Sequence, residues 1–277
     1  MAIIAFDLYG TLLSTDSIAA ELAKAVGEES GRALAALWRR YQLEYTWRIN
    51  SMGHYRPFNT ITLAALHHAA ADLNLIDALF GHNVEQHLMR AYDALDVFPD
   101  VPAGLARIVQ EKSRPADSNI DDGGKDGNVK EKGVIQGAWI FSNGTYDMLA
   151  SSVANSPGLR SALQTALNGL VSIDSMPPGA RAYKPAPQTY AHFCAHVGAE
   201  LNHVVNPGDV WLVSSNPFDI LGAVAAGMRA VWVDRKATGW VDGLGGCLSE
   251  GEGGLGPTVV VRGVEEAVGE VVRLSTV

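Results

Sequence analysis

The chain has 277 residues, of which 47% are hydrophobic, and it carries a net charge of −9. This length allows one large α/β domain with a smaller companion, and the negative charge without a basic cluster excludes a nucleic-acid surface. The two cysteines, Cys194 and Cys247, are too few and too far apart for a disulfide framework, which favours a reducing, cytoplasmic compartment.

The N-terminal segment has no basic start, and Asp7 interrupts its apolar stretch, so it does not have the pattern of a secretion signal. No apolar window in the sequence reaches about 18 residues, the length that spans a bilayer. We therefore expect no membrane partner.

The first predicted element is a short buried strand. The apolar residues 3–6 precede Asp7, and Gly10 and Thr11 then allow the backbone to turn. Asp7 should stand at the carboxyl end of this strand, which is where ligands bind in α/β sheets. Taken alone, an Asp that starts a turn is an equally good interpretation.

Residues 15–96 contain no strand signal and favour an all-helical insertion. We expect helices over residues 16–27, 30–50, 60–75 and 83–95. On the second of these, an apolar stripe includes Leu34 and Trp38, whereas Arg39 and Leu43 lie four residues apart on another face. That second face suits the wall of a pocket.

From residue 97 the pattern changes to strands that alternate with helices. Strands are expected near 135–141, 170–173, 210–213 and 230–233, and helices near 101–111, 145–167, 187–197 and 217–226. This alternation predicts an α/β fold with a doubly wound parallel sheet. The core domain would comprise residues 1–14 and 97–277, the helical cap residues 15–96, and the polar, glycine-rich segment 113–133 a disordered loop.

Three further polar clusters follow predicted strands, at residues 142–144, 183–185 and 214–219. Each is weak alone, since Ser-Asn-Gly is mostly a turn and Lys-Pro mostly a helix stop. Carboxyl ends of parallel strands share one edge, so these clusters should converge with Asp7. The residues expected to meet there are Asp7, Ser142, Lys184, Asn216 and Asp219.

With these residues in place, the sequence resembles the haloacid dehalogenase superfamily and, within it, the L-2-haloacid dehalogenase family. The superfamily pattern is matched by Asp7, Thr11, Ser142, Lys184 and Asp219. The narrower match rests on residues 6–12, 37–47, 142–144, 183–185 and 214–219. The resemblance covers most of the chain except the 113–133 loop and parts of the C-terminal region, and it implies a Rossmann-like core with an inserted cap.

Position 9 separates two activities of this superfamily. Its phosphatases usually carry a second Asp two places after the nucleophile, whereas this chain has Tyr9. A halide leaves without a general acid, so the loss is tolerable for dehalogenation and damaging for phosphate ester hydrolysis. The phosphatases also bind magnesium through clustered acids near the third polar cluster, where this chain has Ser214, Ser215 and Asn216 and keeps only Asp219. The resemblance therefore implies no metal and no cofactor.

The activity implied is hydrolysis of short L-2-haloalkanoic acids to D-2-hydroxy acids through an ester on Asp7. Lys184 would hold the Asp7 carboxylate, Asp219 and Asn216 would place the hydrolytic water, and Arg39 would stabilise the departing halide. The resemblance adds Thr11 and Ser214 as catalytic residues, and Leu8, Tyr9, Ser142, Asn143, Arg40, Leu43, Phe58, Phe218 and Tyr190 as residues of the substrate site.

Two of these positions differ from close relatives, which often have Gln at Arg40 and Trp at Phe218. Arg40 either adds to anion binding or points to solvent. The expected partners are a small halogenated carboxylic acid and a halide ion, and the resemblance implies a homodimer.

Other interpretations stay open at this point. Asp7 could open a strained cyclic amine that bears a carboxylate, the protein could be a phosphatase, or it could be an inactive binding protein with this fold. His192 and His196, four apart on a helix, superficially suggest a metal site, but no third ligand is evident and surface or core histidines are favoured.

Overall fold

The computed structural model describes residues 1–80, 84–114, 133–248 and 254–276. Most of the segment predicted to be disordered, residues 115–132, lies outside the described residues. None of the helices in the described ranges combines the length and the apolar character that crossing a membrane requires.

The centre of the core is a six-stranded parallel sheet in the order β3-β2-β1-β4-β5-β6. The strands are β1 (Ala2–Phe6), β2 (Ile135–Ser142), β3 (Gly169–Ser172), β4 (Val210–Ser214), β5 (Arg229–Val233) and β6 (Val259–Val261). All five residues of β1 are buried, as expected for a strand covered on both faces. The predicted doubly wound α/β fold is confirmed.

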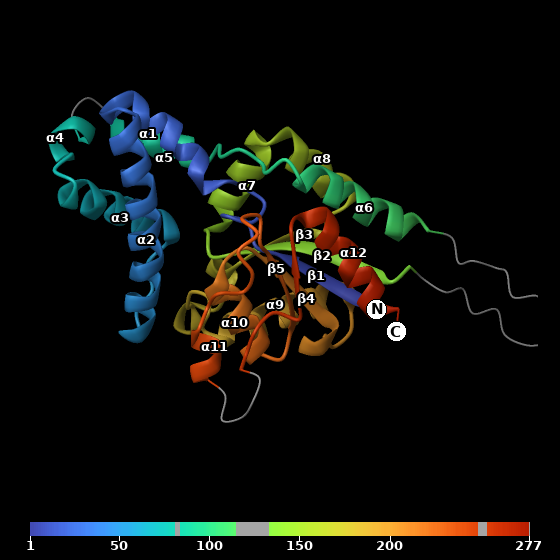
Figure 1. The fold of residues 1–277 in the computed structure, drawn as a ribbon. Coiled ribbons are helices and arrows are strands. Elements are labelled where there is room, and N and C mark those ends of the chain that lie inside the picture. The colour runs from blue at the N-terminus through green and yellow to red at the C-terminus, as the bar shows by residue number, and fades with distance from the viewer. Residues whose placement is uncertain (81–83, 115–132, 249–253, 277) are drawn as a thin grey trace, which may run out of the picture.

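Helices cover both faces of this sheet (Figure 1). They are α6 (Val101–Ser113), α7 (Tyr146–Asn155), α8 (Pro157–Thr165), α9 (Pro187–Leu201), α10 (Pro217–Ala225), α11 (Leu244–Cys247) and α12 (Val264–Ser275). Helices α6 and α12 pack against each other on one face, and α9 and α10 on the other. Short 3-10 turns occur at Thr15–Ser17, Ile173–Ser175, Pro178–Ala180 and Pro207–Asp209.

In the described part of residues 15–96, all regular structure is helical. These helices are α1 (Ile18–Val26), α2 (Glu28–Ser51), α3 (Phe58–Asp72), α4 (Ile76–Leu79) and α5 (Val84–Tyr92), which we call the cap. Gly27 separates α1 from α2 with φ +83°, a conformation that favours glycine. The domain boundaries at residues 14/15 and 96/97 stay a prediction.

Candidate active site

Strand β1 delivers Asp7 to the carboxyl edge of the sheet. Phe6 pairs with Ile140 of β2 and with Val213 of β4, so Asp7 is the next residue out on the central strand. Its N–H still donates to the Val213 carbonyl, at 3.0 Å. The backbone then turns through Gly10, with φ +88°, and this turn brings Thr11 back toward the Asp7 carboxylate.

The two oxygens of the Asp7 carboxylate have unequal surroundings. Oδ2 accepts hydrogen bonds from Thr11 Oγ1 at 2.8 Å and from Asn216 Nδ2 at 2.7 Å. Among the residues that the structure describes, Oδ1 accepts from Lys184 Nζ alone, at 3.4 Å. Thr11 Oγ1 itself accepts from the Ser215 N–H at 2.9 Å, which directs the threonine hydroxyl hydrogen at Asp7.

Lys184 is buried beneath the nucleophile with all three of its ammonium hydrogens engaged. Its Nζ donates to Asp219 Oδ2 at 2.9 Å and to the Phe141 carbonyl at 2.8 Å, in addition to Asp7. It also lies 4.0 Å from the centre of the Phe141 ring. The Lys184 N–H donates to Asn143 Oδ1 at 2.9 Å, so the backbone of this residue is fixed as well.

Asp219 has no solvent exposure. Burial raises the pKa of its carboxyl to about 6; the charge of Lys184 opposes this rise, and that of Asp7 adds to it. The Tyr190 hydroxyl donates to Asp219 Oδ1 at 2.9 Å. Burial and the neighbouring Asp219 hold the pKa of Tyr190 well above its ordinary value, so Tyr190 remains a donor.

Arg39 reaches this group from the cap. Its Nη2 lies 3.3 Å from both the Tyr9 carbonyl and Asn216 Oδ1, and its Nη1 donates to Gln42 Oε1 at 2.6 Å. Asn216 donates in turn to Asp7. Arg39 of the cap is therefore separated from the nucleophile by one intervening side chain, that of Asn216.

The predicted apolar residues form two separate contacts. The rings of Tyr9 and Phe58 stack with their centres 6.1 Å apart, and the Tyr9 hydroxyl shares a hydrogen bond of 3.3 Å with Ser152 Oγ. Burial raises the pKa of Tyr9, so this phenol stays protonated. Phe218 is half-buried and instead packs edge-to-face with Trp47, with the ring centres 5.5 Å apart.

The remaining predicted residues mostly shape the backbone. Ser214 Oγ accepts from the Asn216 N–H at 3.1 Å, and Ser142 Oγ accepts from the Gly144 N–H at 3.2 Å. Leu8 is buried, and its carbonyl accepts from the amides that close the turn after Asp7. Arg40 is exposed on α2 and is not brought together with the other predicted residues.

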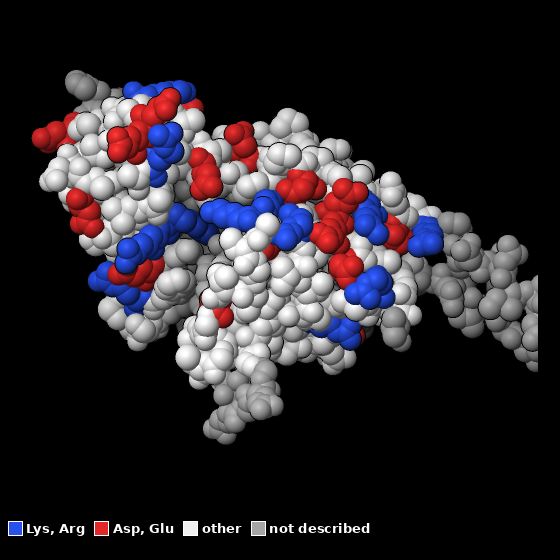
Figure 2. Space-filling view, in the orientation of Figure 1, with Lys and Arg blue, Asp and Glu red and all other residues white. Residues whose placement is uncertain are grey.

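A cleft of about 350 Å³ opens beside Arg39, between the cap and the segment that follows β5. Its charged lining consists of the cations Arg39, Arg235 and Lys236 and the acids Asp16 and Asp234. Figure 2 shows a band of Lys and Arg that crosses the surface from the cap to the core. Arg39 is the cation of this lining that also bonds Asn216, the residue next to Asp7.

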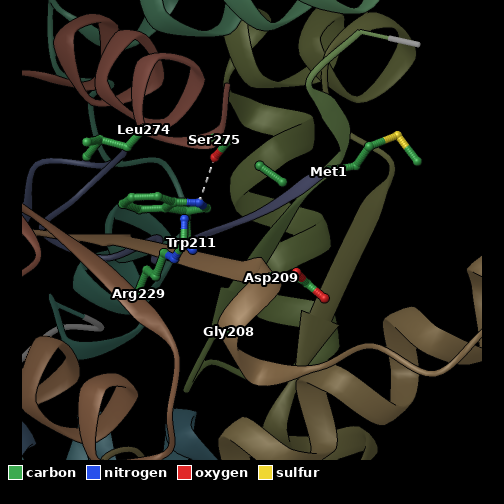
Figure 3. Close-up of a pocket in the computed structure, with 8 residues that line it drawn as sticks. Met1, Gly208, Asp209, Trp211, Arg229, Leu274 and Ser275 are labelled. Carbon is green, nitrogen blue, oxygen red and sulfur yellow. Dashed lines mark hydrogen bonds between the residues drawn. The ribbon is translucent and has the colours of Figure 1, made fainter. Parts of the chain in front are cut away.

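A second cavity of about 140 Å³ lies at the opposite edge of the sheet (Figure 3). It is lined by Met1, at the amino end of β1, and by Trp211, whose indole N–H donates to Ser275 Oγ at 3.1 Å. Because it lies at the amino ends of the strands, it is remote from Asp7 and is not the catalytic site.

Sequence reasoning missed the buried Gln42. Its Oε1 accepts from Arg39 and from the Tyr92 hydroxyl at 3.0 Å, and its Nε2 donates to Thr62 Oγ1 at 2.8 Å. Gln42 continues the spacing of Leu34 and Trp38, which was a signal that it is buried on the same stripe.

It also missed Arg235, which holds the segment beneath the cleft. The Nε and Nη2 of Arg235 each lie 2.8 Å from an oxygen of Asp100, Nη1 donates to Ser215 Oγ at 3.1 Å, and Nη2 also donates to the Thr11 carbonyl at 2.8 Å. No local pattern in the sequence points to this arrangement. Within the described ranges, His, Cys, Asp and Glu form no group of three or more that could hold a metal ion.

No family model matches the chain. The (S)-2-haloacid dehalogenase 4A of Burkholderia cepacia is 32% identical over 83% of this chain and 82% of its own length. Haloacetate dehalogenase H-2 of a Moraxella species is 31% identical over 84% of this chain and 85% of its own. The solved structure of the L-2-haloacid dehalogenase from Xanthobacter autotrophicus with chloropropionic acid covalently bound is 27% identical, covers 99% of both chains and superposes with a TM-score of 0.72. The chain belongs to the (S)-2-haloacid dehalogenase family.

Proposed function

We propose that the protein hydrolyses the carbon–halogen bond of short L-2-haloalkanoic acids, releasing a halide ion and the D-2-hydroxy acid. The observation that carries this conclusion is the pairing of a buried carboxylate, Asp7, with a cation from the cap, Arg39, linked through Asn216. Tyr9 stands where a general acid would be needed for phosphate esters, and its hydroxyl is turned to Ser152. A halide leaving group needs no such acid.

In the first step, one oxygen of Asp7 attacks the carbon that bears the halogen. We assign Oδ1 as the attacking atom, because Oδ2 is occupied by two short hydrogen bonds from Thr11 and Asn216. A carbon–oxygen bond forms with inversion, the carbon–halogen bond breaks, and the halide takes the electron pair. Arg39 supplies positive charge where the halide's negative charge develops.

In the second step, water attacks the carboxyl carbon of the Asp7 ester. Negative charge then develops on Oδ2, where the Thr11 and Asn216 donors are already in place. The bond between this carbon and Oδ1 breaks, so Oδ1 leaves as the hydroxyl of the product. One proton of the water passes to Oδ1 and makes it a hydroxyl, and the other proton is released by way of Asp219. Lys184 compensates the change in charge on Asp7.

The substrate carboxylate would bind to Ser142, Asn143 and the amide of Leu8, at the ends of β1 and β2. Tyr9 and Phe58 support this assignment as an apolar wall, since both rings are buried and stacked. The family resemblance adds Leu43 and Phe218 to this wall, and Arg40 and Tyr190 to its surroundings. We assign no metal and no cofactor to this reaction.

We also propose a cytoplasmic homodimer, with residues 1–14 and 97–277 as the core domain and 15–96 as the cap. The two cysteines support a reducing compartment, since Cys194 and Cys247 are both free. Light scattering of the purified protein gives the oligomeric state directly, and a monomer at micromolar concentration would remove the homodimer from the proposal.

The test of the activity is halide release from each enantiomer of 2-chloropropionate, with and without EDTA, for the wild type and Asp7→Asn. Release by the wild type alone, from the L enantiomer and unaffected by EDTA, is the expected result. No release from either enantiomer would overturn the proposal and turn attention to ring opening or to phosphatase activity. Release by Asp7→Asn at the wild-type rate would overturn the assignment of the nucleophile.

A further inference from the structure

Helix α2 spans the active site and carries a polar side chain at each end of the span. Arg39 and Asn50 are eleven residues apart, which is about three turns and roughly 16 Å along the axis, so both point to the same side of the helix. Arg39 contacts Asn216 and Tyr9 on one side of the nucleophile. Asn50 contacts the segment that carries Lys184 on the other.

The amide of Asn50 pairs with both backbone groups of Tyr183. Asn50 Oδ1 accepts from the Tyr183 N–H at 2.9 Å, and Asn50 Nδ2 donates to the Tyr183 carbonyl at 2.7 Å. Tyr183 directly precedes Lys184. One side chain of the cap thus fixes the backbone from which the catalytic lysine extends.

The side chain of Tyr183 is enclosed by the cap as well. Its ring stacks on Tyr55 with centres 5.3 Å apart, lies 5.8 Å from Phe58, and its hydroxyl donates to the Arg56 carbonyl. The residue has no solvent exposure. A residue of the core is therefore embedded in the cap next to the catalytic group.

On its other side, this segment is held by the core. The Lys184 N–H donates to Asn143 Oδ1, and Lys184 Nζ contacts Asp7 and Asp219. A shift of α2 would therefore be transmitted through Tyr183 to the ammonium group beside the nucleophile. The same shift would move Arg39 away from Asn216.

We propose that Asn50 is a positioning residue for the dehalogenation reaction: through the backbone of Tyr183 it sets Lys184 beside Asp7 and, through α2, Arg39 beside Asn216. The inference rests on the proposed function of the site. It assigns to Asn50 an effect on the chemistry that a residue serving only stability would not have.

The test compares Asn50→Ala with Ser51→Ala. Both changes lie in the last turn of the same helix, and Ala is a better helix former than either residue, so neither weakens α2 intrinsically. Ser51 is exposed, and within the described ranges its side chain bonds its own helix alone, at the Arg48 carbonyl, which makes Ser51→Ala the matched control. Steady-state kinetics with L-2-chloropropionate and L-2-bromopropionate, together with the melting temperature, are measured for each.

Loss of two hydrogen bonds that position catalytic groups should lower kcat/KM for the chloro substrate about 30-fold, mainly through kcat. The loss should be roughly threefold smaller for the bromo substrate, since bromide leaves more easily and depends less on Arg39. Ser51→Ala should stay within about twofold of the wild type. Equal losses for both halides, or an unchanged kcat, would overturn the proposal.

Asn50→Asp separates positioning from space filling. It keeps the size of the side chain and the acceptor for the Tyr183 N–H, but replaces the donor with an oxygen that faces the Tyr183 carbonyl. A positioning role predicts a loss at least as large as that of Asn50→Ala, and wild-type kinetics in Asn50→Asp would contradict it. Halide release by the wild type is measured first, so failure of the proposed function is recognised separately from failure of this inference.

Discussion

The ammonium of Lys184 lies 2.9 Å from Asp219 Oδ2, and neither side chain is accessible to solvent. Burial of this carboxyl costs more than the lysine recovers, because the pKa of Asp219 is raised from 3.8 to about 6. The Asp219 carboxyl is therefore ionised mainly when the pH is above that value.

This pKa predicts a pH dependence of turnover. Release of the water proton needs the Asp219 carboxylate, so kcat for L-2-chloropropionate should rise with pH with a midpoint near pH 6. A kcat profile that is flat between pH 5 and 7 would contradict the role of Asp219.

Stability should move the other way over the same range. The unfolded chain releases the Asp219 proton near pH 4 and the folded chain near pH 6, so the contribution of this group to the free energy of unfolding falls as the pH rises between them. Urea unfolding of the wild type and of Asp219→Asn at pH 4 and pH 7 measures it. The free energy of unfolding of Asp219→Asn, relative to that of the wild type, should be higher at pH 7 than at pH 4.

Tyr190→Phe should shift the acid limb of the kcat profile. The Tyr190 hydroxyl donates to Asp219 Oδ1 at 2.9 Å, and its removal takes a donor from the charged form of the carboxyl. A hydrogen bond of about 1 kcal/mol corresponds to roughly 0.7 of a pKa unit, so the midpoint should move up by about that amount. Activity at pH 6 should then fall more than activity at pH 8. A uniform loss at every pH would instead indicate a general distortion of the site.

The convergence of the polar residues could be predicted from the sequence because it depends on topology. Asp7 and Asn216 follow strands and Ser142 ends one, and a parallel sheet brings such positions to one edge whatever the side-chain packing. Lys184 was placed at this edge by the same sequence pattern, whereas Thr11 followed from the family resemblance, and both lie within hydrogen-bonding reach of Asp7.

The contacts that hold this group in place could not be predicted in the same way. Asn50 and Tyr183 are 133 residues apart, and Arg235 and Asp100 are 135 apart. An amide or guanidinium that bonds a distant backbone leaves no local pattern. Helix α12 was not predicted either; its valines, including Val264, Val268 and Val271, favour strands by composition, although their spacing is helical.

Gly222→Ala should destabilise the protein although it lies within helix α10. Alanine there would ordinarily add about 1 kcal/mol of helix stability. A Cβ at this position would overlap the Tyr190 hydroxyl and come within 2.6 Å of Pro185 Cβ, next to Lys184. We expect a net loss of roughly 2 kcal/mol in the free energy of unfolding, because the packed core cannot move aside freely.

Gly158→Ala in helix α8 is the control for this substitution, since nothing lies within 4 Å of the added carbon. It should leave stability unchanged or raise it by up to about 1 kcal/mol. Urea denaturation and kcat are measured for both variants. If Gly222→Ala proves as stable and as active as Gly158→Ala, the close approach of α10 to Tyr190 does not constrain the site.

Arg39 and Arg40 offer a comparison of adjacent side chains with the same charge. Arg39 bonds Asn216, Tyr9 and Gln42, whereas Arg40 is exposed on the same helix. Arg39→Gln should lower kcat/KM for L-2-chloropropionate by about 100-fold or more, as for loss of a group that stabilises developing charge, and less for the bromo substrate. Arg40→Gln should change kcat/KM by no more than about twofold, since exposed charges act weakly through water. Comparable losses in the two variants would show that Arg40 turns inward when the substrate binds and that both cations hold the anion.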